Sequence, residues 1–235
     1  MADGRGTERV AVRTHFGAVR GGTLMGLLTA GILALMCVYM AVSVTQETPL
    51  AGVRIAVDAG HGGEDRGVCY FEEGLIEKEI NLDMAQRLAA ALQDLGADVL
   101  LTRSDDTFVP LAERAAMANA FGADLFISLH VNRIPGHPEC FGAQTFYFPS
   151  SEAGKRLATA IQQELLKVDP DNYRQPMAGN FAVLRRSEMP GALVEIAFMT
   201  NARDRALLQQ ETYRADVTEA IVRGIIVFLQ GDTDG

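Results

Sequence analysis

Short apolar runs separated by stretches of helical periodicity constrain the fold of this chain most strongly. Residues 53–58, 124–129 and 192–198 are typical of buried strands, while residues 77–95 carry apolar side chains at helical spacing. Strands that alternate with helices predict an α/β fold. We expect three layers: a mostly parallel, twisted sheet of about six strands with helices on both faces. Further strands are expected at 99–102, 143–148 and 181–184, and further helices at 110–120, 151–168, 203–209 and 213–229.

Two histidines follow predicted strands directly, and a glutamate lies inside a third strand. His61 and His130 come after the first two apolar runs, and Glu195 interrupts residues 192–198. Glu77 opens a predicted helix, whose N-terminus lies at the edge where parallel strands end. A buried carboxylate such as Glu195 needs a partner. Two histidines and carboxylates at one edge indicate a catalytic zinc site with three protein ligands and one open position.

Each of these residues also has an ordinary interpretation when it is taken alone. His61 fits an exposed loop, His130 fits a hydrogen-bonded strand end, and Glu77 fits the first helical turn, where the helix dipole favours a carboxylate. Asp58 is either a partner of a ligand histidine or a strand-end cap. Arg185 either contacts a substrate carboxylate or is solvated. Only the convergence at one edge distinguishes the site.

Other catalytic motifs are absent from the sequence or incomplete. His137 and Cys140 lie in a proline-rich loop without a second pair of ligands, which indicates a surface loop. The glycines around His61 lack the Gly-Lys-Ser/Thr element of a phosphate-binding loop. No Gly-x-Ser-x-Gly elbow of a serine hydrolase occurs. Cys69 and Cys140 form one disulfide or remain two free thiols.

The N-terminal part of the chain predicts a membrane anchor. Residues 21–46 contain no charged side chain and are long enough to span a bilayer. Arginines precede this stretch and acidic residues follow it, so residues 1–20 are expected in the cytoplasm and the remainder outside. We therefore expect a linker at 47–52 and a catalytic domain at 53–231. A cleaved signal peptide is the alternative to the anchor.

The overall charge excludes one class of partner. The chain carries a formal net charge of −9 at pH 7, and beyond residues 1–20 it has 17 basic and 28 acidic residues, a balance of −11. Nucleic-acid binding requires a basic surface that neutralises phosphates. We therefore expect no nucleic-acid partner.

Six ordered segments form a more specific pattern, which covers essentially residues 53–229. They are residues 57–65, 77–82, 101–105, 111–114, 128–132 and 193–201. Together they resemble the zinc-dependent N-acetylmuramoyl-L-alanine amidases of the Amidase_3 family. The resemblance implies a Zn2+ cofactor held by His61, Glu77 and His130, with Glu195 as the catalytic carboxylate. It also implies that the substrate is peptidoglycan, cut between the lactyl group of N-acetylmuramic acid and L-alanine.

The match is nearer to one branch of that family, the germination-specific (CwlD-type) amidases of spore-forming bacteria. The similar pieces are the single N-terminal membrane segment, Ile134-Pro135, residues 142–147 and residues 190–193. This resemblance implies removal of stem peptides from spore cortex, so that muramic-δ-lactam is made, by a single-pass protein whose catalytic domain faces the cortex.

The residues leave three other functions open. The first is vegetative wall turnover or daughter-cell separation, and the second is a catalytically silent, membrane-tethered wall-binding protein or activator. The third is a zinc peptidase that cuts within the stem peptide. The segment between Asn132 and Gly142 is too short for the inhibitory helix of division-associated family members, so self-inhibition of that kind is not expected. Ala197 stands where the family usually has glycine, a small change that we expect to be tolerated. A need for an activating protein partner stays open.

Overall fold

The computed structural model describes residues 48–232 of the 235-residue chain. The predicted cytoplasmic tail 1–20 and membrane anchor 21–46 lie outside these residues. Within 48–232, no helix combines the length and the apolar character needed to cross a membrane. The anchor therefore stays a prediction from the sequence.

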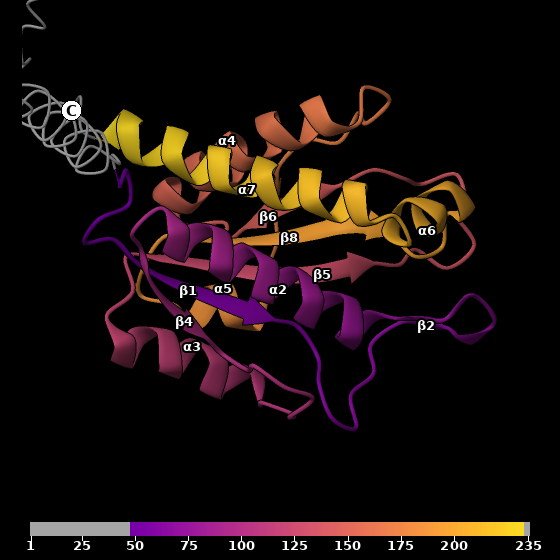
Figure 1. Cartoon of the computed structure of the whole chain (residues 1–235), viewed down its shortest axis with the longest axis horizontal. Coiled ribbons are helices and arrows are strands. Elements are labelled where there is room, and N and C mark those ends of the chain that lie inside the picture. Colours follow the sequence, from indigo (N-terminus) through magenta and orange to yellow (C-terminus); the bar gives the residue numbers. More distant parts are fainter. Residues whose placement is uncertain (1–47, 233–235) are drawn as a thin grey trace, which may run out of the picture. The chain divides into compact units, whose positions relative to one another are not determined.

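The described residues form a six-stranded sheet, a small hairpin and helices on both faces of the sheet (Figure 1). The strands are β1 (Arg54–Ala59), β2 (Cys69–Tyr70), β3 (Leu75–Ile76), β4 (Asp98–Leu101), β5 (Leu125–Asn132), β6 (Gln144–Tyr147), β7 (Met177–Ala178) and β8 (Gly191–Phe198). The helices are η1 (Phe71–Glu73), α2 (Glu77–Asp94), α3 (Leu111–Phe121), α4 (Glu152–Val168), α5 (Ala182–Arg186), α6 (Ala202–Leu208) and α7 (Glu211–Asp232).

The sheet has the order β4-β1-β5-β8-β6-β7. Strands β4, β1, β5 and β8 are parallel, whereas β6 runs antiparallel to β8 and pairs in parallel with β7. The prediction of a mostly parallel six-stranded sheet is thereby confirmed. The carboxyl ends of β1, β5 and β8 consequently lie at one edge, where open α/β sheets bind their ligands.

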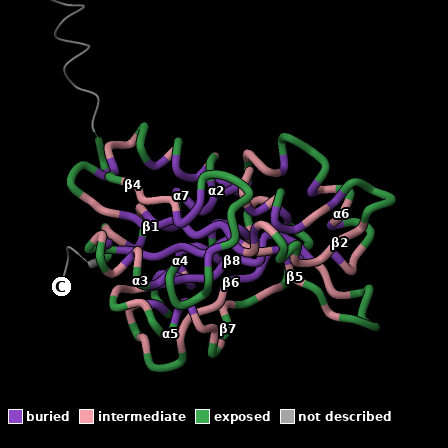
Figure 2. Tube along the Cα trace, turned by 90° about the horizontal axis from the view of Figure 1, so that it is seen from below, coloured by how far each residue is buried: buried purple, intermediate pink, exposed green. Residues whose placement is uncertain are grey.

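Successive side chains of the central strands point to opposite faces and fill two separate cores. Ile55 and Ile127 lie in the larger core, which α2, α4 and α7 cover. Ala56, Phe126 and Leu193 lie in a smaller core with side chains from α3 and α5. Figure 2 shows that the buried residues are concentrated in these central strands. Burial on both faces explains why the sequence of each strand is continuously apolar.

The prediction of a strand at 181–184 is wrong. These residues begin α5, in which Arg185 donates its backbone N–H to the carbonyl of Phe181. Four apolar residues have no periodicity that separates strand from helix. Val183 and Leu184 pack into the smaller core, and β7 supplies the sixth strand in place of the expected one. The other predicted elements are confirmed with small shifts at their ends.

The β2–β3 hairpin was not predicted from the sequence. It projects from the domain immediately before α2 (Figure 1), and its two strands are only two residues long each. So short a pair carries no readable alternation of polar and apolar residues. Its register, with Cys69 opposite Ile76, brings the chain back directly to the start of α2.

A buried ion pair joins the strands beneath the edge of the sheet. Asp58 and Arg114 are almost fully buried, and an Arg114 Nη1 donates to Asp58 Oδ1 at 2.9 Å. Thr102 and Ser128 donate their hydroxyls to the same carboxylate at 2.6 and 2.7 Å. Asp58 therefore connects β1, β5, α3 and the end of β4, and its side chain bonds no histidine among the described residues.

We predict that Asp58→Asn destabilises the protein by about 3–5 kcal/mol, because it leaves the buried Arg114 guanidinium without its counter-charge. Equilibrium urea unfolding of the full chain measures this. The matched control is Asp98→Asn, whose carboxylate is exposed and lies 4.0 Å from Arg54. The control is expected to change stability by less than about 0.5 kcal/mol. Equal effects of the two substitutions would contradict the assignment.

Candidate metal centre

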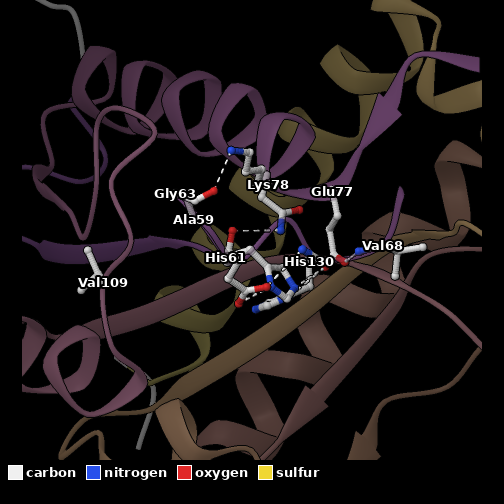
Figure 3. A network of polar contacts seen from close by, with 12 residues as sticks. Ala59, His61, Gly63, Val68, Glu77, Lys78, Val109 and His130 are labelled. Atoms are coloured by element: carbon white, nitrogen blue, oxygen red, sulfur yellow. Dashed lines mark hydrogen bonds and ion pairs between the residues drawn. The ribbon is translucent and has the colours of Figure 1, made fainter. Parts of the chain in front are cut away.

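Three elements bring the predicted ligand residues together at the carboxyl edge of the sheet (Figure 3). His61 lies in the loop after β1, Glu77 is the first residue of α2, and His130 lies near the end of β5. Glu77 Oε1 lies 3.0 Å from His61 Nε2 and 3.1 Å from His130 Nδ1. One candidate ligand atom from each of the three residues lies within 4.8 Å of the others.

The side chain of Glu77 is buried and held from several sides. Val68 donates its backbone N–H to Oε2 at 2.8 Å, and Val131 donates to Oε1 at 3.1 Å. Burial alone would raise the pKa of Glu77, but the contacts with His130 and His61 outweigh it and hold that pKa well below its usual range. Glu77 is therefore an anion, at a helix N-terminus that favours negative charge.

His61 adopts a backbone conformation that only glycine adopts readily. Its φ is +62°, the sole positive φ at a non-glycine residue among residues 48–232. Gly60 and Gly67 allow the close approach of the ligand side chains. A Cβ on Gly60 would lie 2.3 Å from the ring of His130, and one on Gly67 would lie 2.5 Å from Glu77 Oε2. A non-glycine residue with a positive φ, such as His61, is strained, and strain of this kind clusters at functional sites.

Asp65 orients the ring of His61, a role that the sequence analysis missed. His61 Nδ1 lies 2.8 Å from Asp65 Oδ2, which leaves Nε2 directed at Glu77. Burial alone would lower the pKa of His61, but hydrogen bonds and charge from Glu77 and Asp65 raise it to about 9. A carboxylate behind a ligand histidine is typical of metal centres. The available signal was an aspartate four residues after His61 in a glycine-rich loop.

Glu195 lies beside the three-residue cluster on the neighbouring strand. Its Cα pairs in register with that of His130, so the pleat directs both side chains to the same face of the sheet. Glu195 is buried, and its Oε2 has no hydrogen-bond partner among the described residues. Burial raises the pKa of this carboxyl to about 7. Such a group is a candidate for transferring protons near neutral pH.

The donor set fits a divalent metal. Two imidazole nitrogens and one carboxylate oxygen converge, as in catalytic zinc sites of the His₂Glu type. The carboxylate is ionised and hydrogen-bonded, and one imidazole already has a carboxylate behind it. These features are the supporting contacts that metal ligands usually have.

The remaining residues from the sequence analysis lie outside the cluster. His137 pairs with Glu139 at 2.8 Å, and both side chains are exposed, as expected for a surface loop. Cys69 and Cys140 are free thiols. Arg185 donates to Asn180 Oδ1 at 2.6 Å from the surface of α5.

Comparisons with known proteins identify the family of this chain. The sequence profile of the N-acetylmuramoyl-L-alanine amidase family Amidase_3 matches residues 55–227. The N-acetylmuramoyl-L-alanine amidase LytC of Bacillus subtilis is 39% identical over 184 residues, which cover 77% of this chain but 36% of LytC. The germination-specific N-acetylmuramoyl-L-alanine amidase of the same species is 32% identical over 193 residues, which cover 76% of this chain and 80% of that protein.

A solved structure shows the same fold. The CwlD amidase from Clostridioides difficile, in complex with the GerS lipoprotein, superposes with a TM-score of 0.73 and 31% sequence identity. The match covers 76% of this chain and 99% of that one. The chain therefore belongs to the Amidase_3 family of N-acetylmuramoyl-L-alanine amidases, enzymes that act on peptidoglycan.

Proposed function

We propose that this amidase is zinc-dependent, with His61, Glu77 and His130 as the zinc ligands and Glu195 as the general base. The observation that carries the proposal is the convergence of three donor atoms beside a buried carboxylate with an unpaired oxygen. The bond cut is the amide between the lactyl group of N-acetylmuramic acid and L-alanine, in agreement with the family.

The roles of the residues follow from their surroundings. Zinc supplies the Lewis acidity that polarises the amide carbonyl and acidifies an attacking water. Glu195 accepts the proton of that water and returns it to the nitrogen of the leaving L-alanine. A pKa of about 7 suits both steps, because the carboxylate must gain the proton and then release it. Asp65 holds the His61 ring so that Nε2 faces Glu77.

The geometry disfavours one of the alternative functions, and product analysis separates a second. A silent wall-binding protein has no need for an ionised, buried Glu77 or for the strained backbone of His61. A zinc peptidase that cuts within the stem peptide would use the same residues, so the products separate it from the amidase. The amidase frees the amino group of L-alanine and leaves the muramic lactyl carboxylate.

We predict that Glu195→Gln binds one zinc per chain but loses about 10²–10⁴-fold in turnover, because the amide cannot accept the proton. Purified peptidoglycan with stem peptides is incubated with the zinc-loaded full chain, and the products are identified by mass spectrometry. The matched control is Glu139→Gln, which alters an exposed carboxylate and is expected to leave turnover unchanged.

Three outcomes of this experiment separate the alternatives. Near-normal turnover by Glu195→Gln would refute its role as the base. Peptides that do not begin with L-alanine would indicate a peptidase. Product that forms only after an exported lipoprotein is added would show a partner requirement, a possibility that the complex of CwlD with GerS brings forward.

We predict that zinc affinity rises with pH up to about 9. Zinc binds neutral imidazole, and metal-free His61 is protonated at pH 7 because its pKa is raised to about 9. Below pH 9, each unit of pH lowers the concentration of the single competing proton tenfold, and the affinity is expected to rise about tenfold. Competition with a chelating dye from pH 6.5 to 9.5 measures this.

The exposed histidine provides the control for the pH experiment. His137→Gln is expected to leave the pH profile unchanged, since His137 contacts Glu139 and lies outside the cluster. An affinity that stays constant between pH 7 and 9 would contradict the assignment of His61 as a ligand with a raised pKa.

We further propose that the enzyme acts on spore cortex, removing stem peptides for muramic-δ-lactam formation. The germination-specific amidase of Bacillus subtilis is 32% identical over 193 residues, and the CwlD amidase shares the fold with a TM-score of 0.73, which supports this proposal. Residues 133–143 contain no helix, so the described residues include no inhibitory insert beside the site. The charge-free stretch 21–46 supports a single membrane anchor that directs the catalytic domain outward.

We predict that a strain without this gene forms spores that lack muramic-δ-lactam, because the lactam requires removal of the stem peptide. Muropeptide analysis of purified spores measures the lactam. The full chain is expected to restore it, and Glu195→Gln is not. Spores with normal lactam, together with chained vegetative cells, would instead support the alternative of daughter-cell separation.

A further inference from the structure

Arg103 is a buried arginine whose side-chain nitrogens all donate to backbone carbonyls. Its Nε donates to Ala59 at 2.9 Å, and its Nη1 donates to Asp105 at 2.9 Å. Its Nη2 donates to both Gly60 and Lys78, at 2.9 and 2.8 Å. One guanidinium thus holds three segments of chain that are distant in sequence.

The two carbonyls that share Arg103 Nη2 flank residues of the candidate metal centre. Gly60 immediately precedes His61, and Lys78 immediately follows Glu77. A single nitrogen therefore connects the loop that carries one ligand to the first turn of the helix that carries the other. The bridge therefore joins the two backbone segments that carry His61 and Glu77.

Lys78 provides a second connection between the same loop and the same helix. Its Nζ donates to the carbonyl of Gly63 at 2.8 Å and to Asp106 Oδ2 at 2.6 Å (Figure 3 shows the bond to Gly63). Arg103 and Lys78 thus hold the loop on both sides of His61, which keeps its strained backbone conformation.

Arg103 does not form an ion pair with any carboxylate of the described residues, whereas Arg114 pairs with Asp58. Burial and the charge of Arg114 lower the pKa of Arg103. The carboxylates of Asp58, Asp105 and Asp106 stabilise its charge only from beyond ion-pair distance, so its direct contacts are hydrogen bonds to carbonyls. The rigid guanidinium fork suits this arrangement, because it donates to several carbonyls at once.

We propose that Arg103 is a positioning residue that sets the separation of His61 and Glu77 for metal binding, with Lys78 as the second connection. The proposal rests on the zinc-dependent function above. Arg103 contacts neither ligand side chain, so it acts through the backbone carbonyls of Gly60 and Lys78.

The test is Arg103→Lys in the full chain. Lysine keeps the positive charge, but one ammonium group cannot replace a fork that bonds four carbonyls. The dissociation constant for zinc is expected to rise about 10–100-fold, as for other residues that support metal ligands. The visible absorption of the Co2+-loaded protein is expected to change as well. The matched control is Arg87→Lys on α2, away from the candidate metal centre, where the partly buried Arg87 pairs with Asp83 and with Glu211 of α7.

Unfolding of the metal-free protein separates positioning from stability. The expected result is weaker zinc binding and an altered Co2+ spectrum in Arg103→Lys, with urea unfolding of the chelated protein close to that of the unchanged chain. Unchanged zinc affinity and spectrum would overturn the proposal, whatever the unfolding shows. If Arg103→Lys does not fold, Lys78→Met takes its place, and an unchanged zinc affinity there overturns the proposal equally.

The unchanged chain distinguishes this inference from the proposed function. If it binds no zinc, the zinc-dependent function fails and the inference fails with it. If it binds zinc and releases peptides that begin with L-alanine, but Arg103→Lys binds zinc equally well, the inference alone fails.

Discussion

The buried carboxylate of Glu77 is the interaction on which the arrangement of the site depends. A carboxylate at such a depth is stable only with charged or hydrogen-bonding partners. Those partners come from three directions: the N–H of Val68 before the helix, the N–H of Val131 on β5, and the rings of His61 and His130. The position of α2 against the sheet is therefore specified by polar contacts at its first residue as well as by its apolar face.

The loop that carries His61 poses a different problem. It leaves β1 at the edge of the sheet, where its backbone carbonyls have no ladder partners, and buried carbonyls must be paired. Arg103, Arg114 and Lys78 supply donors to the carbonyls of residues 59, 60, 61 and 63. Long cationic side chains thus donate the hydrogen bonds that a neighbouring strand donates elsewhere in the sheet. This explains how His61, a proposed metal ligand, keeps a left-handed backbone conformation without regular secondary structure.

The sequence was sufficient to predict which residues meet at one edge of the sheet, because their meeting depends only on the order and direction of the strands and helices. Parallel strands end at one edge, so residues after β1 and β5 and at the start of α2 had to meet there. The register that places His130 beside Glu195 cannot be predicted from the sequence of either strand alone. A shift of one strand by one residue would turn all its side chains to the opposite face of the sheet. The roles of Asp65 and Arg103 depend on loop conformation, which has no periodicity. The short apolar run that forms α5 lacked enough residues to reveal its period.

Three buried carboxylates near this edge differ in role because their surroundings differ. Asp58 has an arginine and two hydroxyls as partners and joins the strands. Glu77 faces two histidines, which hold its pKa low and keep it ionised as a ligand requires. Glu195 has an unpaired oxygen in an apolar strand, and burial raises its pKa toward neutrality. Carboxyl groups whose pKa values are driven apart by their environment are suited to different tasks within one site. The same residue type therefore supplies a structural tie, the proposed metal ligand and the proposed proton acceptor within one layer of the fold.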